Sequence, residues 1–414
     1  MNILFVVPYV PDLVRVRPHN LIHHLIECGH RVTLATLRSN KEEQPALESL
    51  KKVCYQVYAC DLPKWRTLYN CAMTVPTRKP LQASFCWQPA LANQLGWLTG
   101  KVDDHFDIVH VEHLRGARYG LYLKSLSERK ASSPKDNPPI VWDSVDCISS
   151  LFKQAAEKSQ STTSRMITRF EANRTYRYEK WLVEQFNRVL VTSILDKNAF
   201  QLMREPGDRG PEITVIPNGV DLKYFKPDPL VVRRKATLVI SGKMSYHANV
   251  AMVLHLTKDI LPIVWSQKPE VELWIVGKDP PERIMKLAEN PAIKVTGMVN
   301  DIRPFLQSAT IAVAPITYGA GIQNKVLEAM ACETPVVTTS KAVSALSACP
   351  GRDLLVADEP QQFAQAVLDL LDDPEKQKTL GYAGRQYVES NHNWTVIASK
   401  LADVYREVIE SNER

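Results

Sequence analysis

One stretch of the sequence combines glycines, a lysine and a glutamate in an arrangement that suits a bound diphosphate. The stretch Gly319-Ala-Gly-Ile-Gln-Asn-Lys325-Val-Leu-Glu328 follows an apolar run that ends at Pro315. A strand, a glycine turn and a helix from near Ile322 would present free N–H groups and the positive end of the helix dipole to an anion. Lys325 would pair with phosphate oxygen from the first turn, and Glu328, one turn further, would accept hydrogen bonds from ribose hydroxyls. The alternative is a plain strand-turn-helix with a surface glutamate.

Further glycines stand where other apolar runs of the second half end. Gly242 and Lys243 follow ATLVIS, Gly277 follows VELWIV, and Gly297 follows IKVT. Ligands of parallel sheets bind beyond the carboxyl ends of the strands. These positions predict one ligand site in the second half of the chain, with ordinary strand ends as the alternative.

The first half offers charged side chains instead of glycines. Arg15 and Arg17 lie in the predicted first strand-to-helix loop, Pro8–Pro18, where two arginines would contact an anion or remain solvated. Asp143 and Asp146 follow another apolar run, where they would reach an acceptor or cap a helix.

Glycine usage separates the two halves. The chain has 16 Gly against 27 Pro, the reverse of the usual order, and its first glycine is Gly29. A G-x-G-x-x-G turn after the first strand is therefore excluded, and with it the usual N-terminal dinucleotide site. The distribution favours a nucleotide site in the second half.

The elements that must position these residues are strands and helices in alternation. Such alternation predicts βαβ units and parallel sheets. The pattern restarts near Lys235, and the segment FKPDPLVVRRK before it is typical of a linker. We expect two doubly wound α/β domains, with the cleft between them as the default ligand site. The strands expected in the first half are Asn2–Val7, Arg31–Thr36, Lys52–Tyr58, Ile108–Val111, Ile140–Asp143, Arg188–Thr192 and Glu212–Ile216.

Composition narrows the class of protein. The 414 residues carry 51 Lys and Arg against 45 Asp and Glu, a net charge of +6, which fits an anionic ligand and is too weak to imply nucleic acid. The eight cysteines show no C-x-x-C pair and no metal-ligand spacing, which predicts reduced thiols in a cytoplasmic protein. The N-terminus lacks the pattern of a signal peptide, and no run approaches the roughly 18 apolar residues of a membrane span.

Residues 61–105 interrupt the alternation with aromatic and basic side chains, among them Trp65, Arg66, Tyr69 and Arg78. Such a stretch indicates a membrane-surface or acceptor-binding insertion. The alternative, an irregular helical excursion packed on the first domain, is the one we favour from the sequence.

Several motifs in the right order resemble those of glycosyltransferase family 4, the large retaining family with the GT-B fold. The resemblance spans nearly the whole chain. It implies two Rossmann-like domains facing a central cleft, with an acceptor-binding domain over 1–229, a nucleotide-sugar donor domain over 230–390, and a C-terminal helix over 391–414 that crosses back to the first domain. The motifs are VIPNGVDLKYFKP (Val215–Pro227), SGKM (Ser241–Met244), VELWIVGK (Val271–Lys278), VTGMVNDIRPFL (Val295–Leu306), KVLEAMACETPVV (Lys325–Val337) and GRDLLVAD (Gly351–Asp358).

The resemblance also implies roles for single residues of the second domain. Glu328 matches the second Glu of the family's E-x7-E motif, which binds the donor ribose, whereas the first Glu would fall on Ala320 and is missing. Lys243 stands where the family commonly has an arginine that contacts the diphosphate. The second cation of that motif would fall on Ala248, and Lys325 would supply the missing charge. The implied donor-binding residues are Gly242, Gly277, Gly297, Met298, Val299, Gly319, Ala320, Gly321, Ile322, Gln323, Asn324 and Glu328.

In the first domain, FDIVHVEH resembles the family's strand that ends in H-x-H, whose second His contacts the donor sugar. That position is Glu112, and His113 follows it. Either residue would fill the place, and the two would point to opposite faces if the strand continued. The catalytic candidates are thus Glu112, His113, Lys243 and Lys325, with Arg15 and Arg17 as an acceptor or phosphate loop.

The implied reaction is sugar transfer, with retention, from a nucleotide-diphospho-sugar to a hydroxyl acceptor (a glycan, a lipid-linked or a small molecule) in glycan, polysaccharide or glycolipid biosynthesis. No metal or cofactor is expected, because no D-x-D pair stands in a metal-binding context. The expected place is the cytoplasm, with peripheral contact at the inner face of the membrane left open, and oligomeric state is not indicated. A nucleotide-sugar epimerase of GT-B shape and a non-catalytic nucleotide-sugar-binding protein remain as alternatives. A glycan phosphorylase is disfavoured, since the chain is short and no lysine stands out as a pyridoxal anchor.

Overall fold

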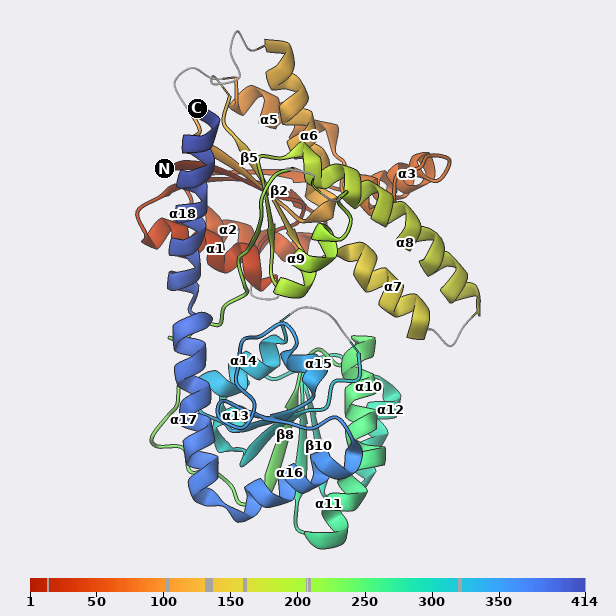
Figure 1. Cartoon of the computed structure of the whole chain (residues 1–414), viewed down its shortest axis with the longest axis vertical. Coiled ribbons are helices and arrows are strands. Elements are labelled where there is room, and N and C mark those ends of the chain that lie inside the picture. The colour runs from red at the N-terminus through yellow and green to blue at the C-terminus, as the bar shows by residue number, and fades with distance from the viewer. Residues whose placement is uncertain are drawn as a thin grey trace. The chain divides into compact units, whose positions relative to one another are not determined.

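The computed structural model describes residues 1–12, 15–100, 105–130, 137–158, 162–205, 207, 210–318 and 322–413. The chain divides into two compact units, Met1–Pro217 with Trp394–Arg414, and Asn218–Asn393. Each unit is a parallel sheet flanked by helices (Figure 1). The predicted pair of doubly wound α/β folds is therefore confirmed.

The first unit contains a seven-stranded parallel sheet of order β3-β2-β1-β4-β5-β6-β7. The order reverses between β1 and β4, so loops leave these two strands toward opposite sides and create a ligand position between them. The strands are β1 (Asn2–Val7), β2 (Arg31–Arg38), β3 (Gln56–Asp61), β4 (Ile108–Glu112), β5 (Ile140–Val145), β6 (Arg188–Val191) and β7 (Ile213–Val215).

Helices cover both faces of this sheet, because successive strand residues point to opposite sides. Ile3 and Phe5 of β1 pack with α1, α2 and α18 on one face, and Leu4 and Val6 pack with α5, α6, α8 and α9 on the other (Figure 1). The helices are α1 (Val16–Glu27), α2 (Gln44–Val53), α3 (Lys64–Thr74), α4 (Leu81–Phe85), α5 (Pro89–Leu98), α6 (His113–Lys130), α7 (Ile148–Lys158), α8 (Thr162–Leu182), α9 (Ile194–Gln201) and α18 (Trp394–Glu413).

The second unit contains a six-stranded parallel sheet of order β10-β9-β8-β11-β12-β13, which reverses between β8 and β11. Its strands are β8 (Thr237–Ser241), β9 (Glu272–Val276), β10 (Ile293–Gly297), β11 (Ile311–Ala314), β12 (Val336–Thr338) and β13 (Leu355–Val356). Its helices are α10 (His247–His255), α11 (Leu261–Gln267), α12 (Glu282–Met285), α13 (Arg303–Ser308), α14 (Asn324–Ala331), α15 (Ser340–Val343), α16 (Pro360–Asp372) and α17 (Pro374–Asn391), with a π-helical turn, Leu256–Ile260, between α10 and α11.

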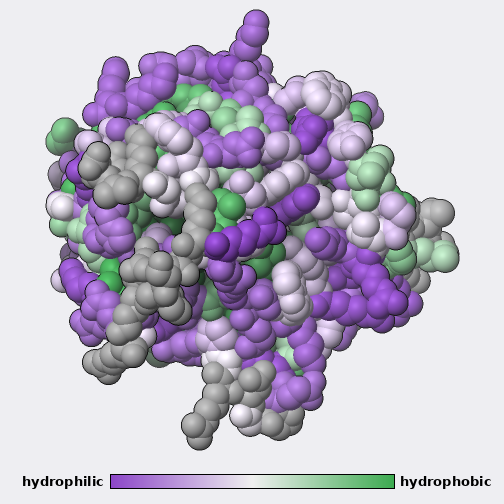
Figure 2. Space-filling model, turned by 90° about the horizontal axis from the view of Figure 1, so that it is seen from above, coloured by the Kyte–Doolittle hydropathy of each residue, from purple (hydrophilic) through white to green (hydrophobic). Residues whose placement is uncertain are grey.

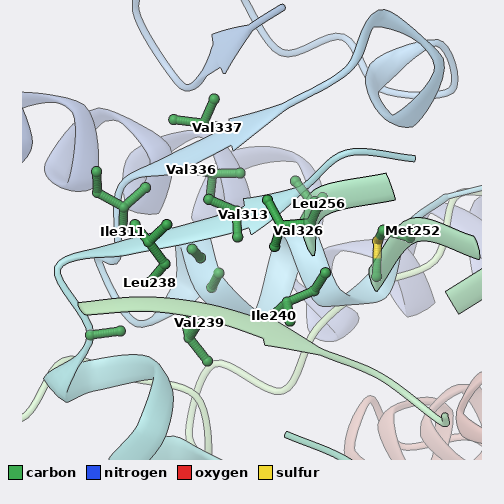
Figure 3. Close-up of a cluster of buried hydrophobic side chains, with 14 of the residues drawn as sticks. Leu238, Val239, Ile240, Met252, Leu256, Ile311, Val313, Val326, Val336 and Val337 are labelled. Atoms are coloured by element: carbon green, nitrogen blue, oxygen red, sulfur yellow. The ribbon is translucent and has the colours of Figure 1, made fainter. Parts of the chain in front are cut away.

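The core of this unit explains why its strands read as continuous apolar runs. Side chains of β8, β11 and β12 interdigitate with Met252, Leu256 and Val326 from the flanking helices (Figure 3). Strands buried on both faces need no polar alternation. The core fixes the strand ends, and the loops that follow them carry the candidate ligand residues.

Two expectations from the sequence differ from the structure. Lys52 and Val53 end helix α2 and are not part of the strand predicted over Lys52–Tyr58, because Leu47 and Leu50 set a helical face that stays buried up to that point. The units divide at Pro217–Asn218, before the expected boundary at 229/230. The segment expected as a linker packs on the second unit, since Phe225 lies against its core.

Within the described residues, no helix is both long and apolar enough to cross a membrane. On the face shown in Figure 2, hydrophilic residues predominate and hydrophobic ones form small patches.

Candidate functional site

The loops that follow β8 and β9 run side by side at the carboxyl edge of the second sheet. The Gly242 N–H donates to the Val276 carbonyl at 3.1 Å, and the Met244 N–H donates to the Lys278 carbonyl at 2.9 Å. Gly242 and Gly277 have φ of +147° and +153°. A Cβ on Gly277 would lie 1.8 Å from the Gly242 carbonyl oxygen, so only glycine fits there.

A test of this close approach is Gly277→Ala. We expect it to lower the free energy of unfolding by about 2 kcal/mol, because the added Cβ forces the two loops apart and strains the backbone. Urea unfolding measures the loss. Gly351→Ala is the matched control, since Gly351 also has positive φ, +83°, but faces open space. Equal losses in the two variants would contradict the account.

Lys325 reaches the same loops from the first turn of α14. Its Cε would lie 3.4 Å from a Cβ on Gly242, and its Nζ donates to Gln323 Oε1 at 3.0 Å. Within the described part of the chain no carboxylate forms an ion pair with it. Burial, partly offset by Glu328, lowers the pKa of Lys325 to about 8. At neutral pH Lys325 is thus a positive charge that is largely removed from water, and among the described residues no ion pair neutralises it.

Glu328 lies one turn along the same helix. Burial raises the pKa of its carboxyl to about 7, and the nearby Lys325 opposes that rise. Its position one turn from Lys325 agrees with the expected geometry for a cation and a hydrogen-bond acceptor on one helix face. The side-chain Oδ1 of Asn324, at the start of the helix, is buried and has no hydrogen-bond partner among the described residues. Both groups gain from a polar ligand at this helix end.

Two residues that position this site escape the sequence prediction. Asn249 donates from Nδ2 to the Lys243 carbonyl at 2.9 Å and packs against Gly242, which fixes the backbone of the loop. Tyr318 stacks on His247, with ring centroids 5.4 Å apart and an Oη–Nδ1 distance of 2.8 Å. The stacked pair joins the end of the loop after β11 to the start of α10. Neither Asn249 nor Tyr318 is part of a sequence motif, so their contribution is visible only in the folded structure.

The other predicted donor residues have mixed positions. Lys243 is exposed beside Gly242, Gly297 ends β10 with φ +66°, and Met298 beyond it is 77% exposed. Val299 is partly buried against the core. Gln323 directly precedes α14, and Ile322 before it is buried. Gly319, Ala320 and Gly321 lie outside the described residues.

A second polar cluster surrounds Tyr9 in the first unit, where the strand order reverses between β1 and β4. The Tyr9 hydroxyl donates to Glu112 Oε1 at 2.8 Å, and the His113 ring lies 6.5 Å away, edge-on. The Arg15 guanidinium lies 4.7 Å from the Tyr9 ring centroid. Three of the four first-domain candidates thus meet at a tyrosine that the sequence did not single out.

Strand β4 ends at Glu112. Glu112 and His113 therefore do not point to opposite faces of a continuing strand, which was the alternative expected from the sequence. His113 begins α6 with φ +64°, and its Nδ1 accepts from the Arg115 N–H at 3.2 Å. Burial lowers the pKa of His113 to about 3 and raises that of Glu112 to about 8, the latter with help from nearby Asp143. At neutral pH both groups are therefore mainly uncharged. The Oε2 of Glu112 is buried and has no hydrogen-bond partner.

The arginines expected to meet an anion are engaged by carboxylates. Arg17 is 5% exposed, donates to Asp143 Oδ2 at 2.8 Å and to the Ile216 carbonyl at 2.9 Å. Arg15 pairs with Glu43 at 2.9 Å. Asp143 also lies 3.6 Å from His110, whose other ring nitrogen meets the Tyr405 hydroxyl at 2.8 Å. Arg17 therefore ties β5 to the end of β7, which is a structural contact.

The buried carboxyl of Glu112 makes stability depend on pH. The folded state keeps a proton up to about pH 8 that the unfolded chain releases near pH 4.5, so this contribution is complete below pH 4.5 and lost as pH rises toward 8. Relative to Glu112→Gln, the wild type is expected to lose about 1.4 kcal/mol per pH unit over that window. Urea unfolding of both proteins at several pH values measures the difference. Parallel stability curves would show that Glu112 is not buried as described.

Among the residues that the structure describes, no group of three or more His, Cys, Asp or Glu side chains is placed to hold a metal ion. The two clusters around Lys325 and Tyr9 thus contain only protein groups suited to hydrogen bonding and charge pairing.

Comparison with known proteins places the Lys325 cluster within a matched family region. Residues 235–373 match the family model of the glycosyl transferases group 1. The matched residues lie within the second unit, which is similar to a group 1 glycosyltransferase domain. The match confirms the family resemblance, and it includes Gly242, Gly277, Lys325 and Glu328. Solved structures that match this chain along its length confirm the GT-B fold. Sucrose-phosphate synthase from Thermosynechococcus elongatus matches with TM-score 0.68 and 18% identity, over 99% of this chain and 100% of its own. Anabaena HepE in complex with UDP matches with TM-score 0.67 and 16% identity, over 98% of this chain and 100% of its own.

Curated relatives are more similar to this chain in sequence but match shorter parts of it. A GDP-mannose-dependent monoacylated alpha-(1-6)-phosphatidylinositol monomannoside mannosyltransferase of Corynebacterium glutamicum is 28% identical over 47% of this chain and 56% of its own length. A glycogen synthase of Mycobacterium tuberculosis is 26% identical over 70% and 72%. The alignments with the first three curated relatives span only 56–59% of the relatives' lengths.

Proposed function

We propose that this chain transfers a sugar from a nucleotide-diphospho-sugar to a hydroxyl acceptor, with retention of the anomeric configuration. The observation that carries the proposal is the partly buried Lys325, packed against the Gly242 loop one turn before Glu328 and without an ion-paired carboxylate among the residues that the structure describes. A diphosphate supplies the anion that Lys325 lacks, and a ribose supplies hydroxyls for Glu328. Relatives named as glycosyltransferases support the reaction class.

The protein's part in the chemistry is electrostatic. As the bond between the sugar's anomeric carbon and the diphosphate oxygen breaks, negative charge grows on the leaving diphosphate. Lys325 and Lys243 stabilise that charge, and the positive end of the α14 helix dipole adds to it. The acceptor oxygen forms the new bond, and its proton passes to a leaving phosphate oxygen. No protein base is then required.

We further propose the setting of the reaction. No metal or cofactor takes part, because the positive groups at α14 and the Gly242 loop supply the charge that a metal would otherwise supply. The acceptor is a glycan or lipid-linked hydroxyl, and the Tyr9 cluster with Glu112 and His113 serves the sugar. All eight cysteines are free thiols, which supports a reducing cytoplasmic compartment.

Product analysis tests the proposal. The chain is incubated with UDP-, GDP-, ADP- and TDP-sugars, with and without hydroxyl acceptors, and NMR follows the anomeric proton. We expect nucleoside diphosphate release and a glycoside of unchanged anomeric configuration. Epimerised donor without acceptor would instead identify an epimerase, and binding without turnover over long incubation would identify a non-catalytic protein.

A further inference from the structure

Helix α3 of the first unit presents apolar side chains outward and polar side chains inward. Trp65, Leu68, Tyr69 and Met73 repeat along one face of the helix and, with Val75 after it, are 52–71% exposed. These five residues are called the α3 face below. Figure 1 shows α3 projecting from the first unit beside α8. An exposed apolar cluster of this kind marks an interaction site.

The inward face of α3 is held by polar contacts. Asn70 is 6% exposed and donates from Nδ2 to the Trp87 carbonyl at 2.8 Å. Arg174 of α8 donates to the carbonyls of Thr74, at 2.9 Å, and Thr77, at 2.5 Å, which caps the end of the helix. Because these bonds fix its orientation, α3 cannot bury its apolar face by rotating onto the unit.

The charged side chains in and after α3 are all positive. Residues 62–100 contain Lys64, Arg66, Arg78 and Lys79 and no Asp or Glu. All but Arg66, whose guanidinium lies 5.5 Å from the Tyr69 ring centroid, are exposed. Two carboxylates that flank this segment are paired: Glu171, which accepts from the Leu81 N–H, with Arg174 at 3.1 Å, and Asp61, before the segment, with Arg38 at 2.7 Å. The surface therefore attracts anions.

We infer that the α3 face docks the protein on an anionic lipid bilayer. A helix in the membrane interface places tryptophan, tyrosine and aliphatic side chains among the headgroups and upper acyl chains, with basic residues against lipid phosphates. The combination of an outward apolar face and an unopposed basic segment matches both requirements. Exposed Phe170 of α8, whose ring centroid lies 5.1 Å from the Arg174 guanidinium, extends the apolar surface. Docking does not depend on the proposed sugar transfer.

Vesicle sedimentation of the full chain tests the inference. We expect binding to vesicles of phosphatidylcholine with about 30 mol% phosphatidylglycerol, and at least about tenfold weaker partitioning to pure phosphatidylcholine and at high salt. Trp65→Ser/Leu68→Ser/Met73→Ser is expected to lower the partition coefficient at least about tenfold, and Arg78→Glu/Lys79→Glu to lower it on anionic vesicles only. All replaced side chains are exposed, so thermal unfolding should not change.

The matched control replaces three apolar side chains elsewhere that are even more exposed, at 84–88%: Leu202→Ser/Leu230→Ser/Val232→Ser. This variant should bind like the wild type. Quenching of tryptophan fluorescence by brominated lipid should fall in Trp65→Phe while sedimentation persists. Absence of wild-type vesicle binding, including the case in which the α3 face serves a protein partner, would overturn the inference. Equal binding by the wild type and the α3 triple variant would also overturn it.

Discussion

Lys325→Met is expected to lower kcat/KM for the nucleotide-sugar about 1,000-fold, which corresponds to about 4 kcal/mol of lost transition-state stabilisation. Methionine keeps the aliphatic packing against Gly242 and removes the charge. The effect is large because this ammonium group is mostly removed from water and has no carboxylate partner among the described residues. Its interaction with a diphosphate is therefore weakly screened, and charge-assisted hydrogen bonds of this kind are strong.

The control for this variant is Lys258→Met, which removes an exposed lysine from the π-helical turn after α10. Steady-state kinetics and donor titration should show it unchanged. If Lys325→Met had the same donor affinity and kcat/KM as Lys258→Met, Lys325 would not be part of the donor site.

The pKa of Lys325 also predicts that donor affinity depends on pH in the alkaline range. With a pKa of about 8 in the free protein, the lysine loses its charge as pH rises above 8, and donor affinity falls about tenfold per pH unit there. Below pH 8 the charge is present and this limb is flat. The limb should vanish in Lys325→Met, and its persistence would assign it to another group.

Glu328→Gln is expected to weaken donor binding about 100-fold, because the amide accepts through one oxygen only and a carboxylate accepts ribose hydroxyls through two. The raised pKa of Glu328, about 7, adds a second limb: as pH falls below 7 the carboxylate gains a proton and affinity falls. Because Lys325 and Glu328 influence each other's titration, the apparent pKa values of the two limbs describe the pair and not the single residues. Titration calorimetry with the nucleotide-sugar at several pH values measures both.

A ligand without the ribose hydroxyls tests whether Glu328 contacts those hydroxyls. In the wild type, the nucleoside diphosphate should bind much more tightly than its 2′,3′-dideoxy analogue, and in Glu328→Gln the two should bind alike. Glu389→Gln, an exposed-helix variant of α17, serves as the control, because it alters a partly exposed pair with Arg385. A dideoxy penalty that survives in Glu328→Gln would place the ribose elsewhere.

Much of the fold follows from single features of the sequence. The runs LFVV, TLVIS and LWIV are strands buried on both faces, and such runs predict parallel sheets without further information. The spacing of Lys325 and Glu328 fixes both on one face of a short helix once the helix is recognised. The close approach of Gly277 to Gly242 agrees with the glycines predicted at strand ends.

Other parts of the fold and of the site depend on contacts between residues that are far apart in the sequence. The local spacing of residue types does not predict such contacts. The unit boundary lies at Pro217–Asn218 because the segment around Phe225 packs on the second core, and that apolar residue stands in a stretch whose prolines and lysines are typical of linkers. Tyr9 gathers Glu112, His113 and Arg15 only after β1 and β4 pair. His113 leaves the strand with positive φ, which no local pattern announces.

The most direct test is a structure of the full chain with the nucleoside diphosphate that raises its melting temperature most in a thermal-shift screen. The account predicts diphosphate density within hydrogen-bonding distance of Lys325 and the Gly242 loop, and ribose density at Glu328. Well-defined nucleotide density at any other place, with Lys325 and Glu328 untouched, would contradict it.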